Sequence, residues 1–140
     1  MKILTAAILF CIILLSSASC GKKEINRYNA DNQKQGFWKE HTQLGTLMAF
    51  GNFDKGIEKG RWVHLDPEGR KWVTYRYGKE RIRVKYFHVS GKVEKKGWAR
   101  MERSPEGLNF YWDGRWKFYS DGGGRDSTVC FSLGKRISCP

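Results

Sequence analysis

Three basic side chains alternate with apolar ones in Arg81-Ile82-Arg83-Val84-Lys85-Tyr86. Successive side chains of a β-strand point to opposite faces, so Arg81, Arg83 and Lys85 would share one face. The surrounding segment, residues 79–103, holds nine Lys or Arg and three acidic residues. This pattern predicts an anion-binding face, suited to lipid headgroups, lipopolysaccharide, glycosaminoglycan or an acidic protein. The alternative is a solvated sheet face whose charges oppose aggregation.

Cys20 follows an apolar run at residues 3–15 and the small residues Ser16-Ser17-Ala18-Ser19. The run suits a secretory signal and is too short to span a membrane. The small residues that end at a cysteine resemble a lipobox. That motif implies diacylglyceryl transfer to the Cys20 thiol, cleavage before it and acylation of the new amine. Ordinary cleavage after Ser19, which would leave a free thiol, is the alternative.

Cys130 and Cys139 are the only other cysteines left after such cleavage, because Cys11 lies in the signal. An even pair in an oxidising compartment favours a disulfide. The pair lacks C-x-x-C spacing and has no histidine near it in sequence, which disfavours a redox or metal role.

No residue pattern points to catalysis. His41, His64 and His88 stand at different distances from the repeat positions described below, so they would not line up as metal ligands. No nucleophile elbow, phosphate-binding loop or zinc-protease motif occurs in the sequence. We therefore expect a non-enzyme with no catalytic residues, no metal, no cofactor and no small-molecule substrate.

Composition bounds the class of protein. A chain of 140 residues predicts one domain, and its formal net charge is +12. Aromatic residues at 14% and 16 glycines against 3 prolines favour strands joined by tight turns. A basic, aromatic-rich sheet could hold nucleic acid, but export from the cytoplasm argues against that partner.

A glycine-punctuated pattern recurs with a period of about 23 residues, which is typical of an array of small repeated units. A full copy has a Gly, a Trp two positions later and a Gly seven positions after that, and the third copy has Ile82 and Val84 in place of the first Gly and the Trp. The copies are Gly36-Trp38-Gly45, Gly60-Trp62-Gly69, Ile82-Val84-Gly91 and Gly114-Trp116-Gly123. A second register, six residues from Gly45 to Gly51 and from Gly91 to Gly97, agrees with the first. Tyr75 replaces that glycine in the second copy, and an insertion at residues 103–111 delays the fourth.

This frame resembles the MORN class of repeats and, more closely, the bacterial repeats of the YwqK-type antitoxin family. The resemblance covers about two thirds of the chain. It implies an antiparallel hairpin array and, for function, a neutraliser that blocks a partner toxin by surface complementarity. With the signal segment, that function would be of a periplasmic, immunity type.

The expected fold is all-β: an elongated, twisted, largely single-layer antiparallel sheet of hairpins. One series of strands falls at residues 37–41, 61–65, 81–88 and 116–119, and the returning strands at 46–50, 71–77 and 93–100. Turns fall at residues 44–45, 66–69, 89–91 and 120–122. The expected divisions are a lipoprotein signal peptide at 1–19, a lipidated cysteine and flexible tether at 20–34, repeats at 35–123 and a capping hairpin at 124–140. A short first strand or helix is the alternative to the tether.

These features together predict a lipid-anchored protein of the bacterial cell envelope, on the outer or inner membrane, periplasmic or surface-exposed. It would be a non-catalytic interaction or structural module that contacts the membrane through its anchor and a protein, glycan or anionic lipid surface through its sheet. The antitoxin-like neutraliser is the alternative.

Overall fold

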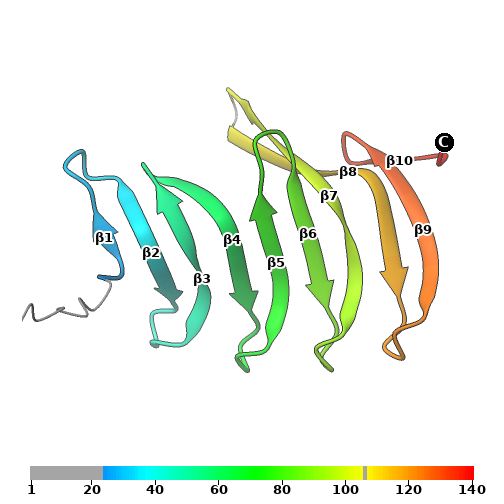
Figure 1. Ribbon diagram of the computed structural model, residues 1–140, viewed down its shortest axis with the longest axis horizontal. Helices are drawn as coiled ribbons and strands as arrows, with labels where there is room; N and C mark the ends of the chain where they lie inside the picture. The colour runs from blue at the N-terminus through cyan, green and yellow to red at the C-terminus, as the bar shows by residue number, and fades with distance from the viewer. Residues whose placement is uncertain (1–23, 106) are drawn as a thin grey trace, which may run out of the picture.

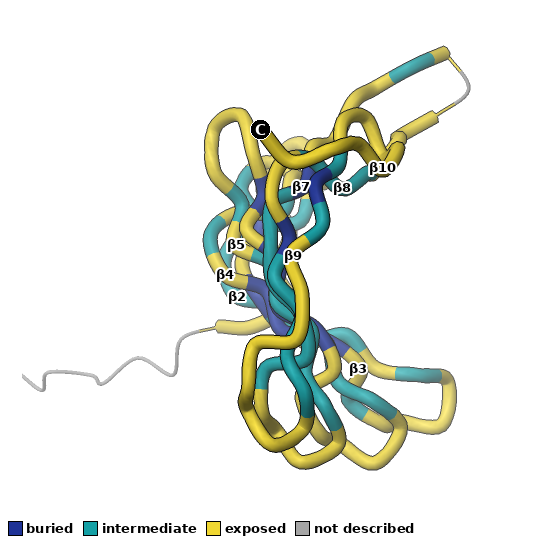
Figure 2. Tube along the Cα trace, turned by 90° about the vertical axis from the view of Figure 1, so that its right-hand side faces the viewer, coloured by how far each residue is buried: buried dark blue, intermediate teal, exposed yellow. Residues whose placement is uncertain are grey.

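The computed structural model describes residues 24–105 and 107–140. It confirms the all-β prediction: ten strands form one open antiparallel sheet, and each strand pairs with its neighbours in sequence (Figure 1). The strands are β1 (Arg27–Tyr28), β2 (Lys34–His41), β3 (Leu47–Asp54), β4 (Ile57–Leu65), β5 (Lys71–Tyr77), β6 (Ile82–Phe87), β7 (Val93–Ser104), β8 (Gly107–Tyr119), β9 (Arg125–Ser132) and β10 (Lys135–Ile137). Seen on edge, the sheet is a single twisted layer (Figure 2).

Four turns of one type line the lower edge of the sheet in Figure 1. In each, a glycine amide donates to the carbonyl oxygen three residues earlier, as Gly45 does to Thr42 and Gly69 to Asp66. The four glycines, at positions 45, 69, 91 and 123, have φ between 81° and 92°. A residue with a Cβ is strained in this left-handed conformation, whereas glycine adopts it readily. This explains the regular spacing of the glycines.

The Gly-x-Trp pairs form β-bulges that seat each indole on the preceding strand. The ladder skips between β3 and β4 at Gly60 and between β7 and β8 at Gly114, and both glycines have positive φ. The Trp62 ring then covers Gly51, where an added Cβ would overlap the indole. Trp62 Nε1 donates to the Asn52 carbonyl oxygen at 3.0 Å. The glycines of the second register therefore provide the surface against which the tryptophan rings pack.

The same arrangement recurs in the fourth copy and is absent from the third, where the sequence departs from the pattern. Trp116 covers Gly97 and donates to the Trp98 carbonyl oxygen at 2.8 Å. In the third copy, Tyr75 lies directly opposite Val84 in a regular ladder without a bulge. The large side chain thus comes from β5 and the smaller one from β6. Because the ladder has no bulge here, Ile82 needs no positive φ, and the next strand still pairs in order.

Most buried side chains lie on one side of the sheet, which we call the aromatic face, while Val63, Thr74 and Cys130 are buried on the opposite side. The most buried members of the aromatic face are Trp62, Val73, Val84, Ala99 and Trp116. Residues paired directly across antiparallel strands project to the same side, which places Tyr75 with Trp62 and Val84. Trp112 stacks on Trp116 with ring centroids 3.8 Å apart. Aromatic plates therefore replace the second layer that a sheet usually packs against.

The predicted tether is wrong for its second half. β1 pairs with the start of β2 through Arg27 and Gln35. Trp38 Nε1 lies 3.2 Å from the carbonyl oxygens of both Arg27 and Gln35. The Trp38 indole has no preceding repeat on which to rest, and β1 supplies that support. The Tyr28 ring of β1 also packs edge-on against the Trp38 indole, with centroids 5.1 Å apart. The short first strand, which was the alternative to the tether, is therefore present, although the polar composition and lack of periodicity did not favour it.

The insertion at residues 103–111 lengthens one hairpin without disturbing the array. β7 and β8 pair without interruption from Trp98–Asp113 out to Ser104–Gly107. The extended hairpin projects beyond the upper edge of the sheet (Figures 1 and 2). The insertion therefore adds ladder pairs where the sequence pattern had indicated only a delay.

Candidate anion-binding face

The alternation predicted for residues 81–86 is present in the structure. Ile82 and Val84 are buried on the aromatic face. Arg83 and Lys85 project to the opposite side, which we call the basic face. Arg81 precedes β6, and its guanidinium lies 4.9 Å from the centroid of the Trp98 ring. The three predicted residues therefore lie on one side of the sheet.

The neighbouring strands extend this group into a longer cluster. Arg76 is paired directly with Arg83, and Arg61 directly with Arg76. On the other side, Lys96 is paired with Lys85, and Lys117 with Lys96. We call the resulting set the cationic band. Its members are Arg61, Arg76, Arg83, Lys85, Lys96 and Lys117.

Sequence reasoning missed four members of the band: Arg61, Arg76, Lys96 and Lys117. They come from strands that the sequence does place, but their alignment depends on hairpin register. At one hairpin, the sequence contains enough information to predict this alignment. Two residues, Lys79 and Glu80, connect Gly78 with Arg81, whose carbonyl oxygen accepts the Gly78 amide at 3.0 Å. This closure sets Arg76 opposite Arg83.

Like charges lie directly opposite one another along the whole band. Four successive cross-strand pairs join two cations: Arg61–Arg76, Arg76–Arg83, Lys85–Lys96 and Lys96–Lys117. Directly opposed like charges destabilise a sheet. The arrangement therefore disfavours the fold and favours the binding of an anion.

The acidic residues of the sheet do not neutralise the band. In the described part of the chain, the ion pairs use five other cations. These cations are Lys34, Lys59, Arg70, Lys95 and Arg100. Arg100, for example, donates to Asp113 at 2.9 Å. The band thus remains an uncompensated positive surface.

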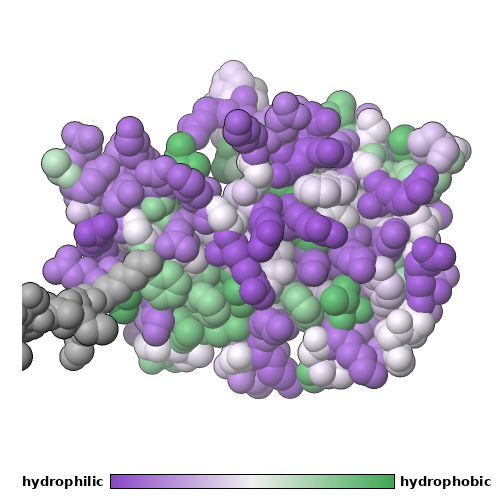
Figure 3. All heavy atoms as spheres, in the orientation of Figure 1, coloured by the Kyte–Doolittle hydropathy of each residue, from purple (hydrophilic) through white to green (hydrophobic). Residues whose placement is uncertain are grey.

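Two adjoining hollows lie along the band, and Arg83 forms a wall of each. The first has a volume of about 320 Å³, with Arg61, Arg76, Lys85 and Phe87 in its lining. The second has a volume of about 210 Å³, and its lining residues are Arg83, Lys96, Gly97, Trp98, Arg115 and Lys117. Hydrophilic side chains cover the middle of the face displayed in Figure 3, with apolar surface gathered over the lower part of β2–β4.

Aromatic rings hold some of these cations in place. The Arg83 guanidinium lies 5.6 Å from the Trp98 ring centroid, on the same ring that Arg81 contacts. Lys96 Nζ lies 4.8 Å from the centroid of Tyr119. Hydrogen bonding and positive charge from Lys96 lower the pKa of the Tyr119 hydroxyl. Cation–π contacts of this kind restrain flexible side chains without cancelling their charge.

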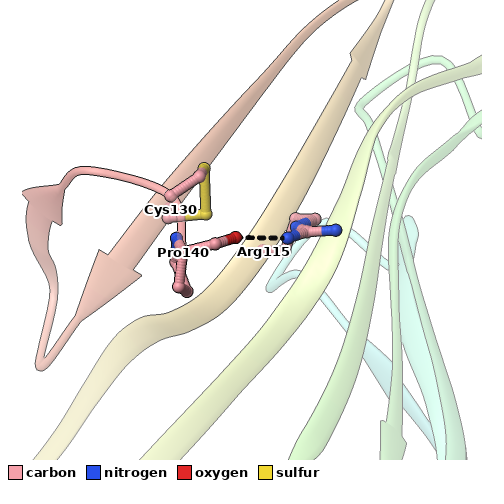
Figure 4. The surroundings of a disulfide bond; sticks show 4 residues. Arg115, Cys130 and Pro140 are labelled. Carbon is pink, nitrogen blue, oxygen red and sulfur yellow. Dashed lines mark hydrogen bonds between the residues drawn. A yellow bond between two sulfur atoms is a disulfide. The ribbon is translucent and has the colours of Figure 1, made fainter.

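The C-terminal hairpin closes the far end of the basic face. A disulfide joins Cys130 on β9 to Cys139 after β10. It brings the carbonyl oxygen of Pro140 to 3.0 Å from Nη2 of Arg115, which donates to it (Figure 4). A disulfide closing so short a loop contributes about 2–3 kcal/mol on the chain-entropy model.

The described residues gather no three metal-ligating side chains at one place. His64 packs on the aromatic face, while His88 Nε2 lies 2.9 Å from the Tyr119 carbonyl oxygen. Across residues 24–105 and 107–140, no helix has the length and apolar character needed to span a membrane. Cys20 and the predicted signal lie outside the described residues.

Comparison with family models, curated proteins and solved structures finds no match for the chain.

Proposed function

We propose that the protein is a lipid-anchored, non-catalytic binding module of the bacterial cell envelope, and that its basic face holds an anionic surface or partner. The observation that carries this proposal is the cationic band, in which four like-charge pairs lie uncompensated on neighbouring strands. A merely solvated face would gain stability from opposite charges in these positions.

The anchor is the second part of the proposal and depends on Cys20. Acyl chains contribute roughly 0.8 kcal/mol for each buried methylene, so three chains would hold the protein on a bilayer. Metabolic palmitate labelling of the wild type, absent from the Cys20→Ser variant, supports this part. Label that persists in the variant refutes the anchor and leaves the role of the basic face standing.

Binding is tested with the mature chain carrying Cys20→Ser, so that acyl chains do not contribute. The probes are phosphatidylglycerol vesicles and heparin, with phosphatidylcholine vesicles as the uncharged comparison, each over a series of salt concentrations. Arg83→Glu/Lys85→Glu changes two residues of the band. Lys135→Glu/Arg136→Glu makes the same change of charge on β10, whose residues are exposed and lie outside the band.

We expect the band variant to lose at least about tenfold in affinity for the anionic probes, because each charge-assisted contact contributes roughly 1.5–3 kcal/mol. The β10 variant should stay close to the wild type. Binding should weaken as salt increases, since exposed charges are screened. Equal losses in the two variants would show that only net charge matters and would contradict the proposed role of this face.

A further inference from the structure

The cationic band runs across the strands. It places at least one cation on each of five consecutive strands: Arg61 on β4, Arg76 on β5, Arg83 and Lys85 on β6, Lys96 on β7 and Lys117 on β8. Neighbouring strands lie about 4.8 Å apart, so the band extends over about 19 Å. Its positive charges therefore recur from strand to strand in two rows, Arg61–Arg76–Arg83 and Lys85–Lys96–Lys117, which are offset by two residues along β6.

We propose that this band is the binding cleft for an extended acidic polysaccharide, which crosses the sheet from β4 to β8. The inference rests on the proposed function and specifies its ligand. A single small anion reaches only part of a band that extends over about 19 Å. Relief of all four like-charge pairs requires an anion that repeats its charge along the whole band.

The hollows along the band suit sugar rings as well as charge. The first has Phe87 in its lining and the second has Trp98. Cations lie over both rings: Lys71 over Phe87, and Arg81 and Arg83 over Trp98. The rings add apolar surface to the hollows, while the guanidinium and ammonium groups that they hold bind the carboxylates or sulfates of a sugar. Thr74, which is buried between longer side chains, leaves depth in the first hollow.

Two other classes of ligand fit the band less well. In an extended acidic peptide, side chains on one face recur every 6.6 Å or so, which does not match a strand spacing of about 4.8 Å. A membrane presents its headgroups in a plane and would contact the tips of the basic side chains without entering the hollows. A sugar unit advances its chain by a distance close to one strand spacing.

The test measures the affinity of the Cys20→Ser mature chain for heparin oligosaccharides from disaccharide to decasaccharide. Affinity should increase with length until the ligand spans β4 to β8, and then level off. Arg61→Ser/Arg76→Ser removes one end of the band, and Lys96→Ser/Lys117→Ser removes the other. Lys135→Ser/Arg136→Ser is the matched control outside the band.

Each end variant should bind the decasaccharide roughly tenfold or more weakly than the wild type does, since it loses two charge-assisted contacts. Its affinity should also level off at a shorter oligosaccharide length, while the control should behave as the wild type. Far-ultraviolet circular dichroism checks that every variant is folded.

The outcomes separate this inference from the proposed function. If affinity does not depend on length, or if polyglutamate or phosphatidylglycerol vesicles bind more tightly than the decasaccharide, the polysaccharide inference is overturned while an anion-binding face stands. If no anionic probe responds to the band variants, both fail. Tight binding that increases with oligosaccharide length, and that levels off at a shorter length in each end variant, supports the inference.

Discussion

At the scale of single residues, His64 shows how the thin sheet buries a titratable group. Its ring packs edge-on against Tyr75 with centroids 5.2 Å apart, and its Nε2 atom is buried without a hydrogen-bond partner in the described structure. Burial lowers the pKa of His64 below its ordinary value of 6.5, and the charges of Glu58 and Glu40 oppose this shift. The folded protein therefore favours the neutral imidazole.

The pH dependence of stability follows from this shift. Below pH 6.5 the unfolded chain binds a proton at His64 more readily than the folded chain does, so the stability contributed by neutral His64 is lost as pH falls. The slope is at most about 1.4 kcal/mol per pH unit. In His64→Phe, urea unfolding should show a weaker loss of stability between about pH 7 and about pH 5.

His41→Phe is the matched control, because His41 is exposed at the end of β2. It should leave the pH dependence of unfolding as it is in the wild type. A His64→Phe variant with the full acid sensitivity of the wild type would show that another group governs the profile.

Tyr77 illustrates a second consequence of burial on the aromatic face. Its hydroxyl donates to Glu58, and burial together with that hydrogen bond raises the tyrosine pKa. Burial also raises the pKa of Tyr75. Both phenols therefore remain neutral at physiological pH and act as apolar plates with a hydrogen-bonding tip.

At the scale of elements, the repeated structural unit is a tryptophan seated on a glycine of the preceding strand. Gly51 has no positive φ, so its requirement for glycine comes from the Trp62 ring alone. Gly51→Ala should reduce the free energy of unfolding by about 1–3 kcal/mol, because the added methyl displaces a large buried ring. Urea unfolding monitored by tryptophan fluorescence measures the change.

Gly122→Ala is the matched control for that substitution. Its added Cβ would meet only Ser120 Oγ at 3.7 Å, and Gly122 has no positive φ. The control should change stability by no more than about 0.5 kcal/mol. Equal effects of the two substitutions would mean that the seat beneath Trp62 is not tightly packed.

The sequence was enough to predict most hairpins, and the reason is local. Turn geometry depends on a few adjacent residues, so Gly45, Gly69, Gly91 and Gly123 marked the lower edge correctly. β1 was only the alternative to a tether, because its two residues show no periodicity and support Trp38 through one backbone carbonyl and one tyrosine ring. The predicted anion-binding residues shared a face because alternation along one strand is also local.

The rest of the band depends on register between strands, which alternation does not determine. Arg76 aligns with Arg83 through a two-residue loop, whereas Lys96 and Lys117 align past a bulge at Gly114. A shift by one residue would have moved any of these cations to the aromatic face. The extent of the candidate site therefore required the three-dimensional structure.

At the scale of the whole molecule, each strand contacts chiefly its neighbours in sequence, as in other repeat arrays. The sheet has one aromatic face and one basic face, and no second layer covers either in the described structure. Long basic side chains shield the thin core on one side, since their methylene stems pack along apolar surface. Because no second layer covers this face, the cationic band is accessible to a ligand.

If the cationic band binds an anion at the expense of stability, Arg76 should show it most clearly, because cations lie on both sides of Arg76. Arg76→Thr should raise the free energy of unfolding at low salt by a few tenths to about 1 kcal/mol. The gain should shrink in about 1 M salt, where the Debye length is about 3 Å. Lys39→Thr is the control, because Lys39 pairs with Phe50 on the same face.

The most direct measurement is therefore urea unfolding of the wild type, Arg76→Thr and Lys39→Thr at low and high salt, alongside the affinity of each for the heparin decasaccharide. We predict that Arg76→Thr alone is stabilised in a salt-dependent way and binds the oligosaccharide more weakly. An Arg76→Thr variant that is less stable than the wild type at low salt, or that binds with unchanged affinity, would contradict this prediction.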